Sequence, residues 1–148
     1  MRRRTFLAGL GGAIALPALP RTAWAQVTQL DPHVWAITKG APVLKGRVQL
    51  ELPQLADNGN SVAMRVSVQS PMTAEDHVKG IHLFSDRNPV TRMASFYLGP
   101  RAGKAQVSSR VRLAGSQRVT AVAQLSDGSF WSDTAEVIVT LSACLDES

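Results

Sequence analysis

Apolar and polar residues alternate over several short stretches of the chain between residues 46 and 141. In one stretch, Val62, Met64, Val66 and Val68 occupy every second position, with polar or small residues between them. Alternation with a period of two is typical of strands that bury one face. The pattern predicts seven strands, over residues 47–52, 62–69, 78–85, 93–98, 105–113, 118–125 and 129–141.

Pairs of turn-forming residues separate most of these predicted strands. Seven short strands at roughly ten-residue spacing are typical of an immunoglobulin-like antiparallel β-sandwich. We therefore predict an all-β fold and see no internal repeat or second domain. The turn signals are Asn58-Gly59, Ser70-Pro71, Asn88-Pro89, Gly99-Pro100, Ala114-Gly115 and Asp127-Gly128.

Residues 31–39 predict one short helix before the sandwich. Asp31 can cap the first amide groups, Pro32 suits the first helical position, and Gly40 can close the far end. The tryptophan of this segment is expected to be a packing anchor rather than a binding residue. The expected apolar contacts of the helix are Val34, Trp35 and Ile37.

The first 25 residues have the composition of an export signal. A basic start precedes an apolar stretch over residues 6–19, and the small residues Ala23 and Ala25 stand at the expected cleavage site. The apolar stretch is too short and too rich in glycine and proline for a stable membrane span. We therefore expect residues 1–25 to be removed as a signal peptide and no membrane span to remain after processing.

Arg3 and Arg4 begin the sequence Arg-Arg-Thr-Phe-Leu, which fits the twin-arginine type of signal that exports folded proteins. An ordinary secretory signal with a basic start is the alternative. Either type predicts a mature chain that begins at Gln26, outside the cytoplasm. We expect one domain over residues 26–141, followed by a C-terminal arm over residues 142–148.

The formal charge of the chain is +5, from 16 Lys and Arg against 11 Asp and Glu. Four of the basic residues and none of the acidic ones lie in residues 1–25. Without that segment 12 basic residues face 11 acidic ones, a net charge of +1. The composition therefore gives no reason to expect binding to nucleic acid or to an anionic membrane.

No catalytic or metal-binding constellation stands out in the sequence. His33, His77 and His82 are scattered and lack the spacing of metal ligands, so we expect surface or turn histidines and no metal. The Ser-Asp-Gly-Ser run at 126–129 is interpreted as a hairpin turn rather than part of a hydrolase site. No glycine pattern follows a strand and opens a helix, so no cofactor is expected.

Cys144 is the single cysteine of the chain and lies on the predicted arm. In an exported protein a lone thiol is buried, paired with another molecule or used chemically. The tail position favours exposure, whereas the negative charges of Asp146 and Glu147 disfavour the reactive thiolate. These residues alone leave a buried thiol and a working thiol open.

Several segments, taken in order between Lys45 and Leu141, carry a family resemblance. They include VQLELP at 48–53, VSVQSPMT at 66–73, HVKGIHLF at 77–84, SDGS at 126–129, and the shorter matches at 88–89, 94–96, 103–105, 110–113 and 122–123. Together with the signal, the helix and the C-terminal cysteine, these segments resemble SoxY. SoxY is the periplasmic sulfur-carrier subunit of the bacterial thiosulfate-oxidising Sox system.

The resemblance implies an immunoglobulin-like sandwich with a mobile C-terminal arm, and it implies that Cys144 is the site of covalent sulfur attachment. In that family a c-type cytochrome enzyme couples thiosulfate oxidatively to the thiol, and a hydrolase then releases sulfate. The carrier is itself no enzyme. It works in the periplasm as a heterodimer with SoxZ, a second sandwich that lacks a signal and is exported with it.

The arm departs from the family pattern, which typically ends Gly-Gly-Cys-Gly-Gly. Here residues 142–148 are Ser-Ala-Cys-Leu-Asp-Glu-Ser, so the cysteine matches and the flanking glycines are absent. The leading hypothesis is a covalent sulfur carrier that uses Cys144. One alternative is a non-covalent binding or assembly module in which Cys144 is incidental. The other is a thiol-redox protein that forms disulfide-linked dimers through Cys144.

Overall fold

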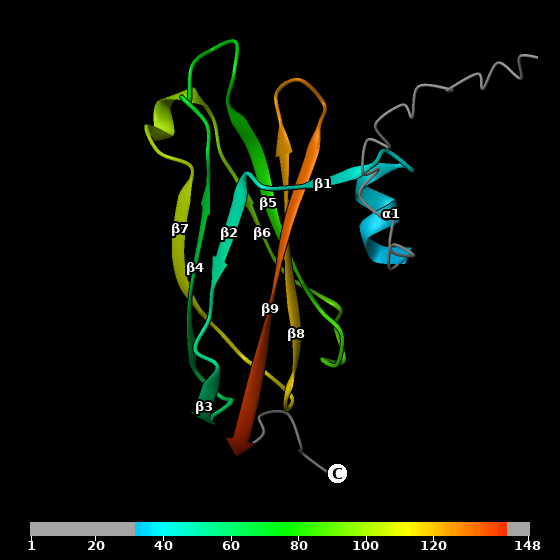
Figure 1. The fold of residues 1–148 in the computed structure, drawn as a ribbon, viewed down its shortest axis with the longest axis vertical. Coiled ribbons are helices and arrows are strands. Elements are labelled where there is room, and N and C mark those ends of the chain that lie inside the picture. Colours follow the sequence, from blue (N-terminus) through cyan, green and yellow to red (C-terminus); the bar gives the residue numbers. More distant parts are fainter. Residues whose placement is uncertain (1–31, 142–148) are drawn as a thin grey trace, which may run out of the picture.

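The structure is a computed structural model that describes residues 32–141. It contains one α-helix, one 3-10 helix and nine strands within those residues (Figure 1). In chain order they are α1 (Pro32–Thr38), β1 (Val43–Lys45), β2 (Val48–Glu51), β3 (Leu55–Asn58), β4 (Val62–Val68), β5 (Val78–Ser85), β6 (Arg92–Tyr97), η1 (Pro100–Ala102), β7 (Gln106–Val111), β8 (Gln117–Leu125) and β9 (Phe130–Leu141).

The strands form two sheets that pack face to face. The larger sheet has the order β1-β9-β8-β5-β6, and β3 also pairs with β9. The smaller sheet has the order β2-β4-β7. All pairs are antiparallel except β1 with β9 and β3 with β9. The predicted immunoglobulin-like sandwich is confirmed, with nine strands instead of seven.

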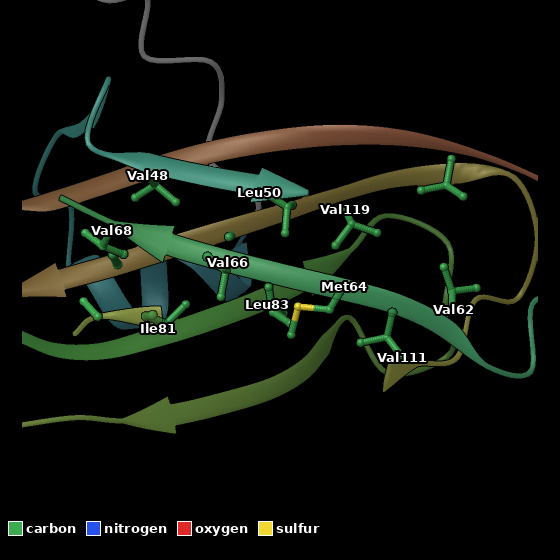
Figure 2. Close-up of a cluster of buried hydrophobic side chains, with 14 of the residues drawn as sticks. Val48, Leu50, Val62, Met64, Val66, Val68, Ile81, Leu83, Val111 and Val119 are labelled. Carbon is green, nitrogen blue, oxygen red and sulfur yellow. The ribbon is translucent and has the colours of Figure 1, made fainter. Parts of the chain in front are cut away.

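The core lies between the two sheets. Every second residue of β4 is buried, from Val62 through Val68, and these side chains face Ile81 and Leu83 of β5 in the other sheet (Figure 2). Ile81 and Leu83 are fully buried. Each large aliphatic side chain removed from water in this way contributes about 1.5–3 kcal/mol to folding. The alternation in the sequence therefore marks the core, as predicted.

Each of the seven predicted strands is present, with ends that differ by at most two residues. The alternation does not indicate β1 or β3. The first is only three residues long, and the second ends in Asp57 and Asn58. Both exist because β9 is 12 residues long and offers its free edge, which pairs with Val43–Lys45 at one end and Leu55–Asn58 at the other.

Helix α1 packs on the outer face of the larger sheet (Figure 1). Val34 is buried against Phe84 and Phe130, with Ile37 packed beside it. The expectation that Trp35 anchors the helix is wrong, because its side chain is 58% exposed. Positions three apart share one helix face, so Val34 and Ile37 meet the sheet while Trp35 turns away.

The predicted end of the helix agrees with the structure, whereas the predicted cap Asp31 lies outside the described residues. Gly40 follows the helix with φ +85°, a conformation in which glycine is favoured. Between residues 32 and 141 no helix has the length and apolar character that a membrane crossing requires.

Candidate functional site

The predicted attachment residue, Cys144, lies outside the described residues, as do the signal residues Arg3, Arg4, Ala23 and Ala25. The structure does describe the point from which the arm begins. This point is Leu141, the last residue of β9. Within residues 32–141, the surroundings of Leu141 therefore form the candidate site.

Two backbone hydrogen bonds connect Leu141 to the β7–β8 connection. The Gly59 N–H donates to the Leu141 carbonyl at 2.7 Å, and the Leu113 N–H donates to the Gly59 carbonyl at 2.8 Å. The Thr140 hydroxyl also donates to the Asp57 carbonyl at 2.9 Å. Leu113 is fully buried. The base of the arm is thus fixed by β3, by the β3–β4 turn and by the segment after β7.

Ser116, between β7 and β8, holds the same end of β9 through its side chain. Its Oγ accepts a hydrogen bond from the Val139 N–H at 2.8 Å and donates to the Val139 carbonyl at 3.4 Å. The β8–β9 ladder pairs Gln117 with Val137, so the side-chain contact extends the pairing beyond the last backbone pair. This arrangement keeps the strand that leads to the arm in register.

Asn88, in the β5–β6 loop, ties that loop to the β7–β8 connection. Its Nδ2 donates to the Arg112 carbonyl at 2.8 Å. Its Oδ1 accepts from the Ala114 N–H at 2.9 Å and from Gln117 Nε2 at 3.0 Å. Ser85 adds a buried contact, since its hydroxyl donates to Gln117 Oε1. The β3–β4, β5–β6 and β7–β8 connections are therefore joined to one another and to the end of β9, where the arm begins.

A groove of about 420 Å³ opens beside this end of the sandwich, between β6 and β7. These strands are the outer strands of the larger and the smaller sheet. Val90, Met93 and Phe96 supply apolar lining, and Val90 is 70% exposed. Arg110 and Arg112 line the groove from the side of β7. Three of the short segments that carry the family resemblance, 88–89, 94–96 and 110–113, contribute to the lining, but no pattern in the sequence marks them as parts of one groove.

The three histidines do not form a metal site with other described residues. No cluster of three or more His, Cys, Asp or Glu side chains suited to a metal ion occurs within residues 32–141. The ring of His77 contacts the Thr73 carbonyl through Nδ1 at 3.0 Å. His77 therefore belongs to a loop contact.

His82 differs from the expectation of a surface or turn histidine, because it is only 4% exposed. Its Nδ1 lies 2.8 Å from Ser95 Oγ, and its ring meets Tyr97 edge-on with 5.9 Å between centroids. Gly80 leaves room for the ring, since an added Cβ would lie 3.3 Å from Nε2. Burial, and then the positive charge of Arg92, lower the pKa of His82. The glycine two residues earlier was the available sequence signal.

Comparison with solved structures supports the fold. The sulfur carrier protein SoxY from Chlorobium limicola f. thiosulfatophilum matches with 28% identity and a TM-score of 0.62, over 74% of this chain and 94% of that one. A superoxide reductase (neelaredoxin) from Ignicoccus hospitalis matches with 19% identity and a TM-score of 0.56, over 64% of this chain and 80% of that one. The likeness to the superoxide reductase is one of fold alone.

A third solved structure, a superoxide reductase from Nanoarchaeum equitans, matches with 12% identity and a TM-score of 0.55, over 65% of this chain and all of that one. No curated protein sequence matches the chain. The family model described as sulfur oxidation protein SoxY matches residues 36–144, a range that ends at the single cysteine. The chain belongs to the SoxY family.

Proposed function

We propose that this protein is a periplasmic sulfur carrier that holds a sulfur intermediate covalently on Cys144. The observation that carries the proposal is the family match, which runs through the sandwich and ends at residue 144. Cys144 is the only thiol in the chain, so it is the only side chain suited to forming a disulfide-type bond with a sulfur compound. The related chain from Chlorobium limicola is a sulfur carrier protein by its name.

The proposed chemistry has two steps, both catalysed by partner enzymes. In the first, the Cys144 sulfur bonds to the terminal sulfur of thiosulfate, the thiol proton is released, and two electrons pass to a c-type cytochrome enzyme. In the second, a hydrolase uses water to cleave the bond between the outer sulfur and the sulfonate group. The sulfonate leaves as sulfate, and one proton is released. A persulfide remains on Cys144. The carrier presents the cysteine and takes no catalytic part.

The described residues support a carrier through the base that they give the arm. The sandwich holds this base firmly, through the contacts at Leu141 and Val139. A fixed base with a terminal cysteine suits transfer between enzymes, because the base sets how far the thiol reaches.

We further propose a partner subunit and an export route for this chain. We expect a heterodimer with a SoxZ-like subunit, carried out of the cytoplasm together with this chain. The twin-arginine pattern at Arg3 and Arg4 supports this expectation, since that pathway exports proteins already folded. A partner without its own signal can then cross in the bound state.

The test is the intact mass of the protein purified from its native periplasm, before and after a reductant. We expect a mass increase of one thiosulfonate or persulfide group that the reductant removes. Cys144→Ser is the matched control and should show no adduct. A bare thiol in the presence of thiosulfate and the partner enzymes would refute carriage. Disulfide-linked dimers without any sulfur adduct would favour the thiol-redox alternative.

A further inference from the structure

The groove between β6 and β7 has an apolar lining that is open to solvent. Val90 is 70% exposed, and Met93 and Phe96 are half-buried. A volume of about 420 Å³ is large enough for one aliphatic side chain with its flanking backbone. Such a surface favours an occupant that brings an apolar side chain.

The charge around the groove is positive. Arg110 and Arg112 line it, and both are exposed. Arg110 donates to the Ser61 side chain at 3.2 Å, whereas the guanidinium of Arg112 has no hydrogen-bond or ion-pair partner among residues 32–141. Asp86, the acidic residue of the neighbouring loop, is already paired with Arg118 at 3.2 Å. The groove therefore suits an acidic segment.

The C-terminal arm of this chain has both properties and begins close by. Leu141 is linked to Leu113 through the two hydrogen bonds of Gly59, and Arg112 directly precedes Leu113. Seven further residues follow Leu141, and a chain of that length spans up to roughly 25 Å. Residues 145–147 are Leu-Asp-Glu, one apolar side chain followed by two acidic ones.

We propose that the arm docks into this groove, with Leu145 against Val90 and Met93 and with Asp146 and Glu147 facing Arg110 and Arg112. Cys144 directly precedes Leu145, so a docked arm should slow chemical modification of its thiol. This inference rests on the proposed function for the role of Cys144, although docking itself requires no bound sulfur. Attachment to the same chain favours docking, because it keeps the segment at a high effective concentration.

The test is the rate at which iodoacetamide, an uncharged reagent, alkylates Cys144 in the mature protein at low ionic strength. Rates are taken at the high-pH plateau, where the thiol is fully ionised, so that a change in thiol pKa does not alter them. We expect Arg112→Glu and Asp146→Lys each to speed alkylation roughly two- to five-fold, the scale of one exposed ion pair. Combining them reverses the charges of the pair and should restore the slow rate.

Arg101→Glu is the matched control, because it makes the same change of charge in η1, before β7, whereas Arg112 follows β7. It should leave the rate unchanged. Equal rates for wild type, Arg112→Glu and Arg101→Glu would overturn the proposal. So would a double variant that stays as fast as Asp146→Lys alone.

A second measurement reports on the groove itself. Leu145→Ala should shift the backbone amide resonances of Val90 and Met93 and leave those of η1 in place. If the amide resonances of the groove do not shift in Leu145→Ala and shift only when a SoxZ-like subunit is added, the groove binds that subunit. This result would refute arm docking. Neither measurement involves a sulfur adduct, so failure of sulfur carriage and failure of docking are separate results.

Discussion

The carboxylate of Asp133 on β9 accepts a hydrogen bond from the backbone N–H of Leu50 on β2, with 2.8 Å between Oδ2 and N. The two residues are 83 positions apart and belong to different sheets. The chain leaves the larger sheet after β1, joins the smaller sheet as β2 and returns as β3. Asp133 therefore binds the crossing segment to β9, the strand that leads to the arm.

Replacing Asp133 with alanine should lower the free energy of unfolding by about 1.5–3 kcal/mol, the contribution of a hydrogen bond to a charged group. Asp133→Asn keeps an acceptor oxygen and should cost less. Urea denaturation measures both changes. Asp57→Ala is the control, because Asp57 is exposed and no interaction of its side chain is present within residues 32–141. Equal losses for Asp133→Ala and Asp57→Ala would contradict the role given to Asp133.

Asn88 should be a second stabilising residue at the arm end of the sandwich. Asn88→Ala removes the acceptor used by the Ala114 N–H and by Gln117 Nε2, and the donor to the Arg112 carbonyl. We expect a loss of about 2 kcal/mol, because the part-buried Ala114 N–H and Gln117 Nε2 lose their shared acceptor. Asn60→Ala, an exposed asparagine bonded only to Asn58 within the described residues, should change stability by less than about 0.5 kcal/mol. Thermal and urea unfolding of the pair provide the comparison.

The sequence predicts the central strands well because their burial follows the alternation, as at Val62 and Val66. It does not predict β3, whose pairing of Leu55 with Ile138 depends on the free edge of a strand 83 residues further along the chain. It also misplaces Trp35, because the helix meets the sheet through Val34 and leaves the larger side chain exposed. These errors all arise from tertiary contacts that local pattern does not encode.

The candidate site was predictable only in part, for the same physical reason. The position of Cys144 after the last strand is visible in the sequence. The proximity of Arg112 to the base of the arm is not, because it depends on hydrogen bonds that join Gly59, in the β3–β4 turn, to the end of β9 and to the β7–β8 connection. A single arginine directly after a strand carries no local signal for a groove.

Stability should depend on pH through His82. Burial, followed by the positive charge of Arg92, lowers the pKa of His82 below the ordinary value of 6.5. The folded state therefore binds this proton less readily than the unfolded state. The stabilising contribution of the neutral ring is complete above pH 6.5 and is lost as the pH falls through the folded-state pKa.

His82→Gln should flatten this part of the profile, because glutamine can contact Ser95 without titrating. The measurement is the free energy of unfolding at mildly alkaline and mildly acidic pH for wild type and variant. His77→Gln, a change in the loop before β5, serves as the control and should leave the slope that is due to His82 in place. A slope that persists in His82→Gln would show that another group dominates.

Export should require the paired arginines. Replacing Arg3 and Arg4 together with lysine keeps the charge but changes the twin-arginine pattern, so we expect unprocessed protein to accumulate in the cytoplasm. Cell fractionation with amino-terminal sequencing is the measurement, and the wild-type mature protein should begin at Gln26. Arg21→Lys is the matched control. Normal processing of the double variant would instead indicate the ordinary secretory route.

Restoring glycine around the cysteine should make the arm a better substrate for enzymes that serve glycine-armed carriers. The variant combines Ser142→Gly, Ala143→Gly, Leu145→Gly and Asp146→Gly, which removes the bulk of Leu145 and one negative charge and adds backbone freedom. We expect faster formation of the thiosulfate adduct on Cys144 with such enzymes, measured by intact mass over time. Leu145→Ala removes most of the bulk and Asp146→Asn removes the charge, each without the backbone freedom that glycine adds. If the quadruple variant forms adduct no faster than wild type, the departure of this arm from the family pattern does not limit its access to those enzymes.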